Sequence, residues 1–401
     1  MRKLQKIFFG VFIVVLLVAS GIGTWLLFFQ GRAPEARPDL VHVPADVPPP
    51  PEGYPTRNAA FLAYALGFVE LVDPWGAIPI PEGVVERTDI DYGREGVEPL
   101  LDLYYPANIE EPAPGLIFIH GGSWSSGGKT DYKLYTTHFA KLGYVTASIS
   151  YRLKGEAKYP AAIEDAKCAV RWMRAHAEQL HVDPERIAVI GGSAGGHLSM
   201  LVGYAPEAAQ WNDVGGYAGV SSEVAAVVDL YGPADLTAPI AQDNETVTSY
   251  LDATFAANPE RFTEASPLTY VDPGDPITLV IHGTTDQVVP VEQSDRLVEK
   301  FQQLDMPYWY ARLDGWMHAL DIVKENNDYC TALFQAFFEE HLAPPPPPAA
   351  PVDNPPDLWP AAGEAQTAPP EPAMKIDEAA APARVANTEA TTGPKTHDNP
   401  R

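Results

Sequence analysis

The segment Arg186–Met200, whose sequence is RIAVIGGSAGGHLSM, constrains the fold of this chain more than any other stretch. It begins with a short apolar run typical of a buried strand, passes through a glycine-rich corner and ends in a helical pattern. A turn this tight forces Ser193, at the centre of Gly-x-Ser-x-Gly, into strained backbone geometry, and the neighbouring glycines avoid Cβ clashes. The segment therefore predicts a strand–turn–helix unit with a serine at its corner.

The alternation of strand and helix extends through residues 80–343. Short apolar runs predict strands at Leu100–Tyr105, Leu116–His120, Tyr144–Ile149, Ile187–Ile190, Val224–Leu230, Ile277–His282 and Tyr308–Leu313. Helical patterns predict helices at Ala161–Gln179, Gly195–Val202, Val291–Gln303 and Asp328–Glu340. Together they predict an α/β fold, with a mostly parallel central sheet and helices on both faces. In such a sheet the chemistry lies at the carboxyl ends of the strands.

A serine hydroxyl becomes a good nucleophile when a base activates it and a carboxylate orients that base. The strand ITLVIHG is followed by TTDQVVP, which places Asp286 in the loop after that strand. The strand YWYARL is followed by DGWMHAL, which places His318 in the loop after the next strand. Ser193, Asp286 and His318 in this order predict a catalytic triad. The alternatives are a turn-capping aspartate and a surface or packing histidine, with Asp314 and Asp321 as fallback acids.

The sequence HGGSW, His120–Trp124, ends the predicted strand LIFIHGG. Glycine lets the main chain approach a tetrahedral intermediate closely, because it has no side chain. The backbone N–H groups of Gly121, Gly122 and Ser123, together with that of Ala194, are therefore predicted to form an oxyanion hole.

Composition excludes several other functions. The net charge of −26 repels phosphate backbones, and no run rich in lysine or arginine offsets it, so nucleic acid is not an expected partner. Neither a metal-ligand spacing nor a cofactor motif is present, and we expect no metal and no organic cofactor. Cys168 and Cys330 fit helical patterns and are interpreted as small buried side chains, which pair only if those helices touch.

The N-terminal 30 residues contain an apolar run without charge, Ile7–Phe29, preceded by basic residues. A membrane-spanning helix needs about 20 apolar residues, so the run predicts a single signal anchor, with a cleaved signal peptide as the alternative. By the positive-inside rule, the rest of the chain lies outside the cytoplasm.

The flanks of the catalytic region have their own patterns. Residues 31–79 are predicted to form a proline-rich linker followed by an apolar helix, Asn58–Val72, which covers the catalytic domain or lies near the membrane surface. Residues 80–343 are the predicted catalytic domain. Residues 344–401 are rich in proline and poor in large apolar groups, which predicts a disordered tail.

The motifs jointly resemble the hormone-sensitive-lipase-like and feruloyl-esterase-like (BD-FAE-like) serine esterases of the α/β-hydrolase superfamily. The resemblance covers about residues 80–342 and rests on HGGSW, SYRL, YPAAIEDAKCAVRWMRAHA, GGSAGGHLSM, YGPADL, HGTTDQVVP and GWMHAL. It implies hydrolysis of carboxylic esters through an acyl-enzyme. Two departures, Ser123 in place of a third glycine and Trp316-Met317 before the histidine, affect the expected shape of the acyl pocket.

The stretch Pro239–Leu268 lies where such enzymes carry a small lid, and an ordinary surface helix pair is the alternative. Trp124, Tyr250 and Trp316 are the predicted substrate-pocket residues. Acetyl or feruloyl esters of polysaccharides, lipid esters and small esters all fit the motifs as substrates. Two other functions stay open, a serine peptidase of related fold and a catalytically silent binding protein.

Overall fold

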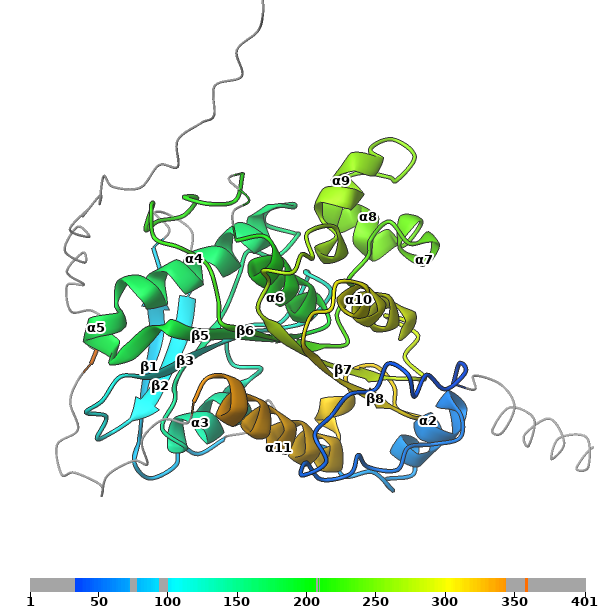
Figure 1. Cartoon of the computed structure of the whole chain (residues 1–401), viewed down its shortest axis with the longest axis horizontal. Helices are drawn as coiled ribbons and strands as arrows, with labels where there is room; N and C mark the ends of the chain where they lie inside the picture. The colour runs from blue at the N-terminus through cyan, green and yellow to red at the C-terminus, as the bar shows by residue number, and fades with distance from the viewer. Residues whose placement is uncertain are drawn as a thin grey trace, which may run out of the picture. The chain divides into compact units, whose positions relative to one another are not determined.

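A computed structural model describes residues 33–72, 78–93, 100–206, 208, 210–343 and 358–359. Its centre is an eight-stranded sheet in the order β1-β2-β4-β3-β5-β6-β7-β8 (Figure 1). The strands are β1 Val84–Asp91, β2 Leu100–Pro106, β3 Ala113–Ile119, β4 Val145–Ile149, β5 Val182–Gly192, β6 Ala226–Leu230, β7 Ile277–Gly283 and β8 Tyr308–Leu313. The pairs from β4 through β8 are all parallel, whereas β1 and β2 add an antiparallel edge. The predicted mostly parallel α/β sheet is confirmed.

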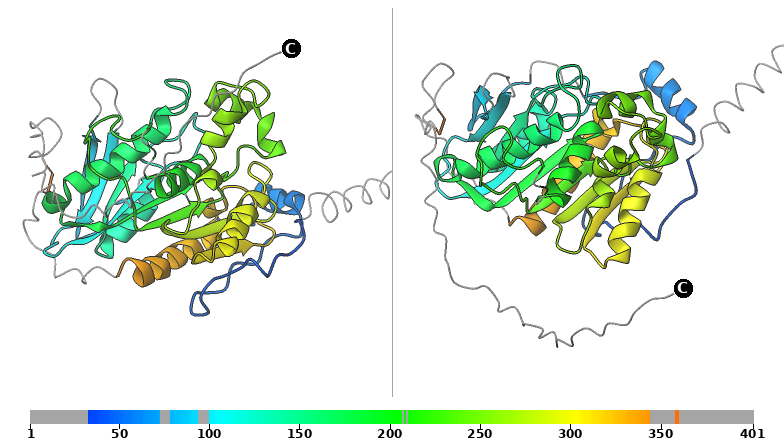
Figure 2. Two further views of the ribbon diagram at one scale, coloured as in Figure 1. Left: turned by 45° about the horizontal axis from the view of Figure 1, so that its top comes forward. Right: turned by 90° about the horizontal axis from the view of Figure 1, so that it is seen from above.

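Helices cover both faces of this sheet (Figures 1 and 2). The longer ones are α3 Lys133–Lys141, α4 Ala161–Ala175, α6 Ala194–Tyr204, α10 Glu292–Gln303 and α11 Lys324–His341. Helices α4, α6 and α10 pack in one hydrophobic cluster, and α3 and α11 pack in the other. The shorter helices are α2 Arg57–Ala65, α5 Ala177–Leu180, α7 Pro239–Gln242, α8 Glu245–Leu251 and α9 Pro259–Glu264, with 3₁₀ turns η1 Pro267–Thr269 and η2 Leu320–Ile322.

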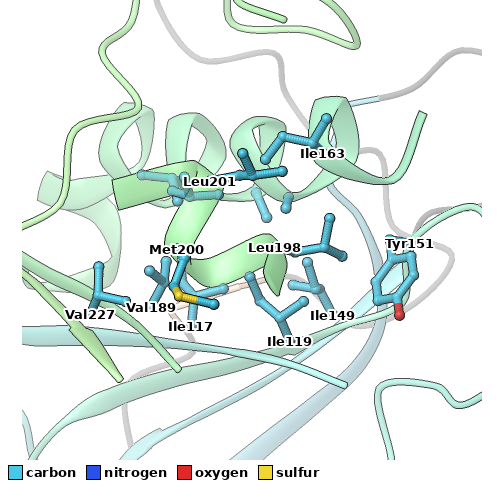
Figure 3. Packing of buried hydrophobic residues seen from close by; sticks show 14 of the residues in the cluster. Ile117, Ile119, Ile149, Tyr151, Ile163, Val189, Leu198, Met200, Leu201 and Val227 are labelled. Atoms are coloured by element: carbon cyan, nitrogen blue, oxygen red, sulfur yellow. The ribbon is translucent and has the colours of Figure 1, made fainter. Parts of the chain in front are cut away.

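The two clusters follow from the alternation of side chains along each strand. In β3, Ile117 and Ile119 belong to the cluster that includes α4 and α6. Leu116 and Phe118 point to the other face and belong to the cluster that includes α11. Figure 3 shows the first cluster, in which Leu198, Met200 and Leu201 of α6 lie over residues of β3, β5 and β6. Strands buried on both faces favour apolar residues on both faces, which explains the nearly continuous apolar runs of the sequence.

Several element boundaries differ from the prediction. The sequence does not predict strand β1, because VVERTDID is mostly polar and the strand pairs with a neighbour on one side only. Helix α3, whose sequence KLYTTHFAK is short and lacks a capping side chain, was also not predicted. Helix α11 begins at Lys324 instead of Asp328, and the predicted helix Asn58–Val72 ends at Ala65.

The segment before α2 packs against the catalytic domain over its described part. Leu40 is fully buried, and His42 forms an isolated bridge with Tyr310 of β8. The guanidinium of Arg37 donates to Glu299 of α10 at 2.8 Å. Residues 33–56 are therefore a strap along the domain, which corrects the prediction of a linker.

Two predictions concern residues outside the described ones. The apolar run Ile7–Phe29 is one of them, and most of the predicted tail 344–401 is the other. Within the described residues, no helix has the length and apolar character required to cross a bilayer.

Leu358 and Trp359 belong to the described part of the tail and are buried in the first cluster, with the Trp359 ring 5.0 Å from that of Trp172. The prediction of a disordered tail is therefore wrong for these two residues.

Both cysteines are buried, and both are free thiols. The interpretation of Cys168 and Cys330 as small buried side chains is confirmed, and the pairing that the sequence left open does not form.

Candidate active site

The strand–turn–helix unit of the glycine-rich motif is formed by β5 and α6, with Ser193 at the corner between them. Ser193 has φ 56° and ψ −119°, in the left-handed region that side chains rarely adopt. Its backbone N–H donates to the carbonyl of Leu230 at 2.8 Å, and its carbonyl accepts from the N–H of His197 at 3.0 Å. The corner needs glycine because a Cβ on Gly195 would overlap the carbonyl oxygen of Ile119. The fold thus stabilises a strained serine.

The structure brings the three predicted triad residues together. Ser193 follows β5, Asp286 follows β7 and His318 follows β8. Because these strands are parallel, all three residues lie at the carboxyl ends of the strands, on the same side of the sheet. Nε2 of His318 lies 3.0 Å from Oγ of Ser193, and Nδ1 of His318 lies 2.6 Å from Oδ2 of Asp286. These distances form a continuous hydrogen-bonded chain from carboxylate to imidazole to hydroxyl.

Asp286 is held by more groups than the histidine alone. Its Oδ1 accepts the backbone N–H groups of Val288 and Val289 at 2.8 and 2.9 Å. Its Oδ2 also lies 3.2 Å from Nε2 of the fully buried His282. Burial alone raises the pKa of Asp286, but the hydrogen bonds from His282 and His318 outweigh it and hold that pKa well below its usual range. Asp286 therefore stays an anion across the neutral range.

His282 supports the carboxylate of Asp286, a contact that the sequence did not predict. Its Nδ1 lies 2.7 Å from Oγ of Ser294 in α10, so the ring is fixed on both sides. The sequence signal was a histidine inside the strand ITLVIHG, four residues before Asp286. A strand histidine of this kind is usually a packing residue, and only the tertiary structure shows that it contacts the carboxylate.

The two fallback acids bind other partners. Asp314 accepts a hydrogen bond from the Thr284 hydroxyl at 3.0 Å. Asp321 accepts from the phenol of Tyr231, whose ring packs edge-to-face on the imidazole of His318 at 4.8 Å. Asp286 is thus the carboxylate that contacts the base.

The loop HGGSW follows β3 and reaches the serine corner. Gly121, Gly122, Ser123 and Ala194 all line the cavities beside Ser193. In the described part of the chain, the backbone N–H groups of Gly122, Ser123 and Ala194 donate no hydrogen bond to another backbone group. At Ala194 this follows from its place in the first turn of α6, where amide groups lack helical partners. These free donors and the positive end of the α6 dipole suit a developing oxyanion.

The loop is supported from below by His120. Its ring stacks on Tyr151 at 4.2 Å, and its Nδ1 lies 2.8 Å from the carbonyl of Gly121. Burial lowers the pKa of His120, so it is a neutral packing residue. His197 is likewise buried, and its Nε2 donates to the carbonyl of Ala265 at 2.8 Å.

Two cavities of different size meet at Ser193. The smaller, about 80 Å³, lies against Trp124, Ala194 and the α7–α8 insertion and is mainly apolar. The larger, a cleft of about 720 Å³, contains His318 and Tyr231 and carries polar side chains. It is lined by Gly121, Gly122, Ser126, Asp131, Tyr132, Asp321 and Asn327, among others. The serine thus has a confined side and a wide side.

The predicted substrate-pocket residues have different positions. Trp124 lines the small cavity. Tyr250 is buried behind it, stacked on the Trp124 ring at 4.3 Å, and so supports the pocket without lining it. Trp316 is also buried, and its indole N–H donates to Pro51 at 3.2 Å, so its prediction as a pocket residue is wrong. The predicted lid does border the small cavity, through Ile240, Ala241, Asn244, Thr246 and Val247.

Among the described residues, no group of three or more histidine, cysteine, aspartate or glutamate side chains is arranged to hold a metal ion.

Comparison with known proteins identifies the family. The sequence model of the BD-FAE family matches residues 101–301, which is half of the chain. The chain belongs to the BD-FAE family. The resemblance to α/β-hydrolase esterases is thereby confirmed, and the match includes Gly121, Gly122 and Ser193, as well as Asp286.

Two curated relatives of this BD-FAE family member are esterases of Mycobacterium tuberculosis. One named "Probable carboxylic ester hydrolase LipM" is 32% identical over 244 residues, 59% of this chain and 56% of the relative. Another, "Esterase LipC", is 34% identical over 248 residues, 60% of this chain and 61% of the relative. The chain therefore spans little more than half the length of these relatives.

Solved structures agree with the fold. A truncated carbohydrate esterase from gut microbiota has a TM-score of 0.57 and 27% identity, covering 66% of this chain and 99% of that one. Esterase Est2 of Thermogutta terrifontis, solved with butyrate bound, has a TM-score of 0.56 and 26% identity, covering 64% and 94%. The BD-FAE family member thus has the α/β-hydrolase fold.

Proposed function

We propose that this protein is a serine hydrolase that cleaves carboxylic esters through an acyl-enzyme. The observation that carries the proposal is the hydrogen-bonded chain from Asp286 through His318 to Oγ of Ser193, at 2.6 and 3.0 Å. The esterase names of its relatives support the same reaction class.

The reaction follows from the positions of these groups. His318 takes the proton of Ser193 as Oγ attacks the ester carbonyl, and the N–H groups of Gly122, Ser123 and Ala194 stabilise the oxyanion. His318 then protonates the departing alkoxide, and the acyl group stays on Ser193. Water, activated by the same imidazole, attacks this acyl-enzyme, which releases the carboxylic acid and restores the serine. Asp286 orients His318 and stabilises its protonated form.

We assign the two halves of the substrate from the two cavities. The leaving alcohol has to lie next to His318, which donates its proton, and His318 lines the 720 Å³ cleft but not the small cavity. The acyl chain stays bonded to Ser193 and extends into the 80 Å³ cavity beside Ala194. The preferred substrate is therefore an ester of a short acyl chain with a bulky alcohol.

An acyl-chain series tests this function and its specificity in one experiment. We expect the full-length chain in mild detergent to hydrolyse nitrophenyl acetate and butyrate. The kcat/KM should then fall by about 100-fold or more toward octanoate, because even one methylene that does not fit costs about tenfold or more.

Val247 lines the small cavity, so Val247→Ala should recover part of the octanoate activity. Val41→Ala, at an exposed position outside that cavity, is the matched control and should leave the chain-length profile unchanged. Absence of ester hydrolysis would overturn the proposed function. Equal activity on butyrate and octanoate would overturn only the short-acyl assignment.

We also propose that the apolar run 7–29 anchors the protein in a membrane, with the catalytic domain outside the cytoplasm. The support is the charge-free run and the basic residues before it. Extraction of membranes at alkaline pH should leave the protein in the pellet, whereas release into the supernatant would contradict an anchor.

A further inference from the structure

Helix α2 and the residues after it expose an unusual number of large apolar side chains. Among the described residues, eight large hydrophobic side chains are strongly exposed, and five of these lie between residues 61 and 71. We call this set the apolar strip; its members are Phe61, Leu62, Leu66, Phe68 and Leu71. Phe61 is 68% exposed and Phe68 is 78% exposed. A soluble surface seldom leaves so many large apolar groups together in water.

The large apolar side chains of α2 lie on its exposed face, the opposite of an ordinary surface helix. Its buried residues are the small Ala60 and Ala63, whereas the bulky Phe61 and Leu62 face solvent. Between Asn58 and Val69 the sequence contains no charged residue. This segment can therefore leave water without the desolvation of a charge.

The apolar strip lies at the mouth of the active site. The strand-like pairing of Leu71 with Val323, and the N–H of Val72 donating to Ile322 at 2.9 Å, fix its end beside η2. Val72 itself lines the large cleft. At the other end, Arg57 donates a hydrogen bond to Gln287, in the loop that carries Asp286.

Two further exposed apolar residues continue the surface across the mouth. Val288, next to Gln287, is 57% exposed and lines both the small cavity and the large cleft. Ile240 of α7 is also 57% exposed and lines the small cavity. Seven of the eight exposed large hydrophobic side chains of the described chain thus belong to the apolar strip or to the cavities that it flanks.

The strap brings the start of the described chain to the same place. Arg312, near the end of β8, donates to the carbonyl of Glu35 at 3.2 Å. Directly after β8, Trp316 packs against Tyr54, two residues before the cap of α2. Figures 1 and 2 show the first described residues beside α2.

The apolar run of the sequence ends at Phe29, four residues before Ala33. Four extended residues span at most about 14 Å. A bilayer that holds the run is therefore close to α2 as well.

We propose that the apolar strip rests on the surface of a phospholipid bilayer and turns the mouth of the active site toward it. The inference rests on the proposed anchor but not on the proposed chemistry. The side chains of such a surface helix enter the boundary between headgroups and acyl chains by about 5–10 Å. A second copy of the chain fits this face less well. A nine-residue helix is about 14 Å long. The surface of so short a helix is too small to bury the roughly 800 Å² per partner that a stable dimer needs.

The bilayer contact can be measured on the full-length chain with one fluorophore per molecule. Cys168 and Cys330 are buried, and burial raises the pKa of both thiols, so an introduced surface cysteine is labelled selectively. Phe68→Cys carries a polarity-sensitive dye on the apolar strip. Glu111→Cys is the matched control, because Glu111 is exposed before the amino end of β3, at the sheet edge opposite the active site.

Both labelled proteins are reconstituted in phosphatidylcholine vesicles, with and without lipids that carry a quenching nitroxide on the acyl chain. We expect blue-shifted emission and nitroxide quenching for the dye at position 68, and neither for the dye at position 111. Vesicle flotation reports the anchor separately, and hydrolysis of a soluble ester reports the chemistry. Floating protein with no quenching at position 68, or with equal quenching at both positions, would overturn the proposal.

Two other outcomes also decide the question. A blue shift at position 68 that nitroxide lipids do not quench, together with energy transfer between labelled copies, would assign the strip to self-association and overturn the bilayer contact. The double variant Phe61→Ser/Phe68→Ser tests the consequence for activity. Its rate on an ester dissolved in vesicles should fall about tenfold or more, because the free energy gained by moving two phenylalanine side chains out of water corresponds to at least this factor. Its rate on a soluble ester should be unchanged, and equal losses on both esters would contradict the proposal.

Discussion

The variant Ser193→Ala is expected to lower kcat for nitrophenyl acetate by roughly 10⁴-fold or more, because it removes the only atom that forms the acyl-enzyme. The oxyanion donors and the cavities remain in the variant, so a small residual rate above the uncatalysed reaction should persist. Steady-state hydrolysis measures the loss. Labelling with a fluorophosphonate followed by intact-mass analysis should show one adduct on the wild type and none on the variant.

The matched control is Ser199→Ala, which removes a serine hydroxyl inside α6, the helix that begins directly after Ser193, at a buried position away from the corner. It should retain the wild-type rate within a few-fold and take up the probe normally. Undiminished turnover by Ser193→Ala, with intact folding by circular dichroism, would show that another residue is the nucleophile.

The second large effect is expected for Asp286→Asn, which should lower kcat by about 10³- to 10⁴-fold. The amide keeps the size of the carboxylate but removes the charge that accepts Nδ1–H of His318 and stabilises the imidazolium. His318 then favours the tautomer with the proton on Nε2, which no longer accepts the proton of Ser193. Because the loss is in the chemical step, kcat should fall more than KM rises.

Asp314→Asn is the control for this prediction. Asp314 is exposed and accepts a hydrogen bond from Thr284, close to the loop that carries Asp286. The variant therefore also replaces a carboxylate by an amide, but at a residue that does not contact His318. Its kcat should stay within a few-fold of the wild type. If Asp314→Asn lost as much activity as Asp286→Asn, or if Asp286→Asn stayed active, the acid of the triad would be misassigned.

Much of the candidate site could be predicted because its signals are local. The tight corner at Ser193 leaves no space for a Cβ on the nearby glycines, so the sequence around the serine itself indicates the corner. Asp286 and His318 each follow an apolar strand, and parallel strands necessarily end at one edge. Position after a strand was therefore enough to predict that these side chains meet.

Residues whose roles depend on contacts between distant segments could not be predicted in the same way. The ring of Trp316 is two residues from His318, yet it points away from the cavities because Pro51 and Tyr54 of the strap cover it. Tyr250 is in the lid as predicted, but the flat stacking of Trp124 on its ring puts it one layer behind the pocket. No periodicity in either segment carries this information.

The strap and the tail illustrate the same point for the fold. Prolines in residues 31–56 fit an extended strap as well as a flexible linker, because neither has a hydrophobic period. Burial of Leu40 and the pairing of His42 with Tyr310 decide between the two. Leu358 and Trp359 are two apolar residues in a proline-rich stretch, and only their packing beside Trp172 shows that they are buried.

The sequence by itself determined the α/β architecture and the candidate nucleophile, base and acid, because the chemistry of a parallel sheet follows from the order of strands and the residues directly after them. The tertiary structure alone decided the second donor to Asp286, the unequal cavities on the two sides of Ser193 and the exposure of the apolar strip. Each of these features depends on how side chains from separate elements pack against one another. No single segment of the sequence contains this information, because the packing partners come from distant parts of the chain.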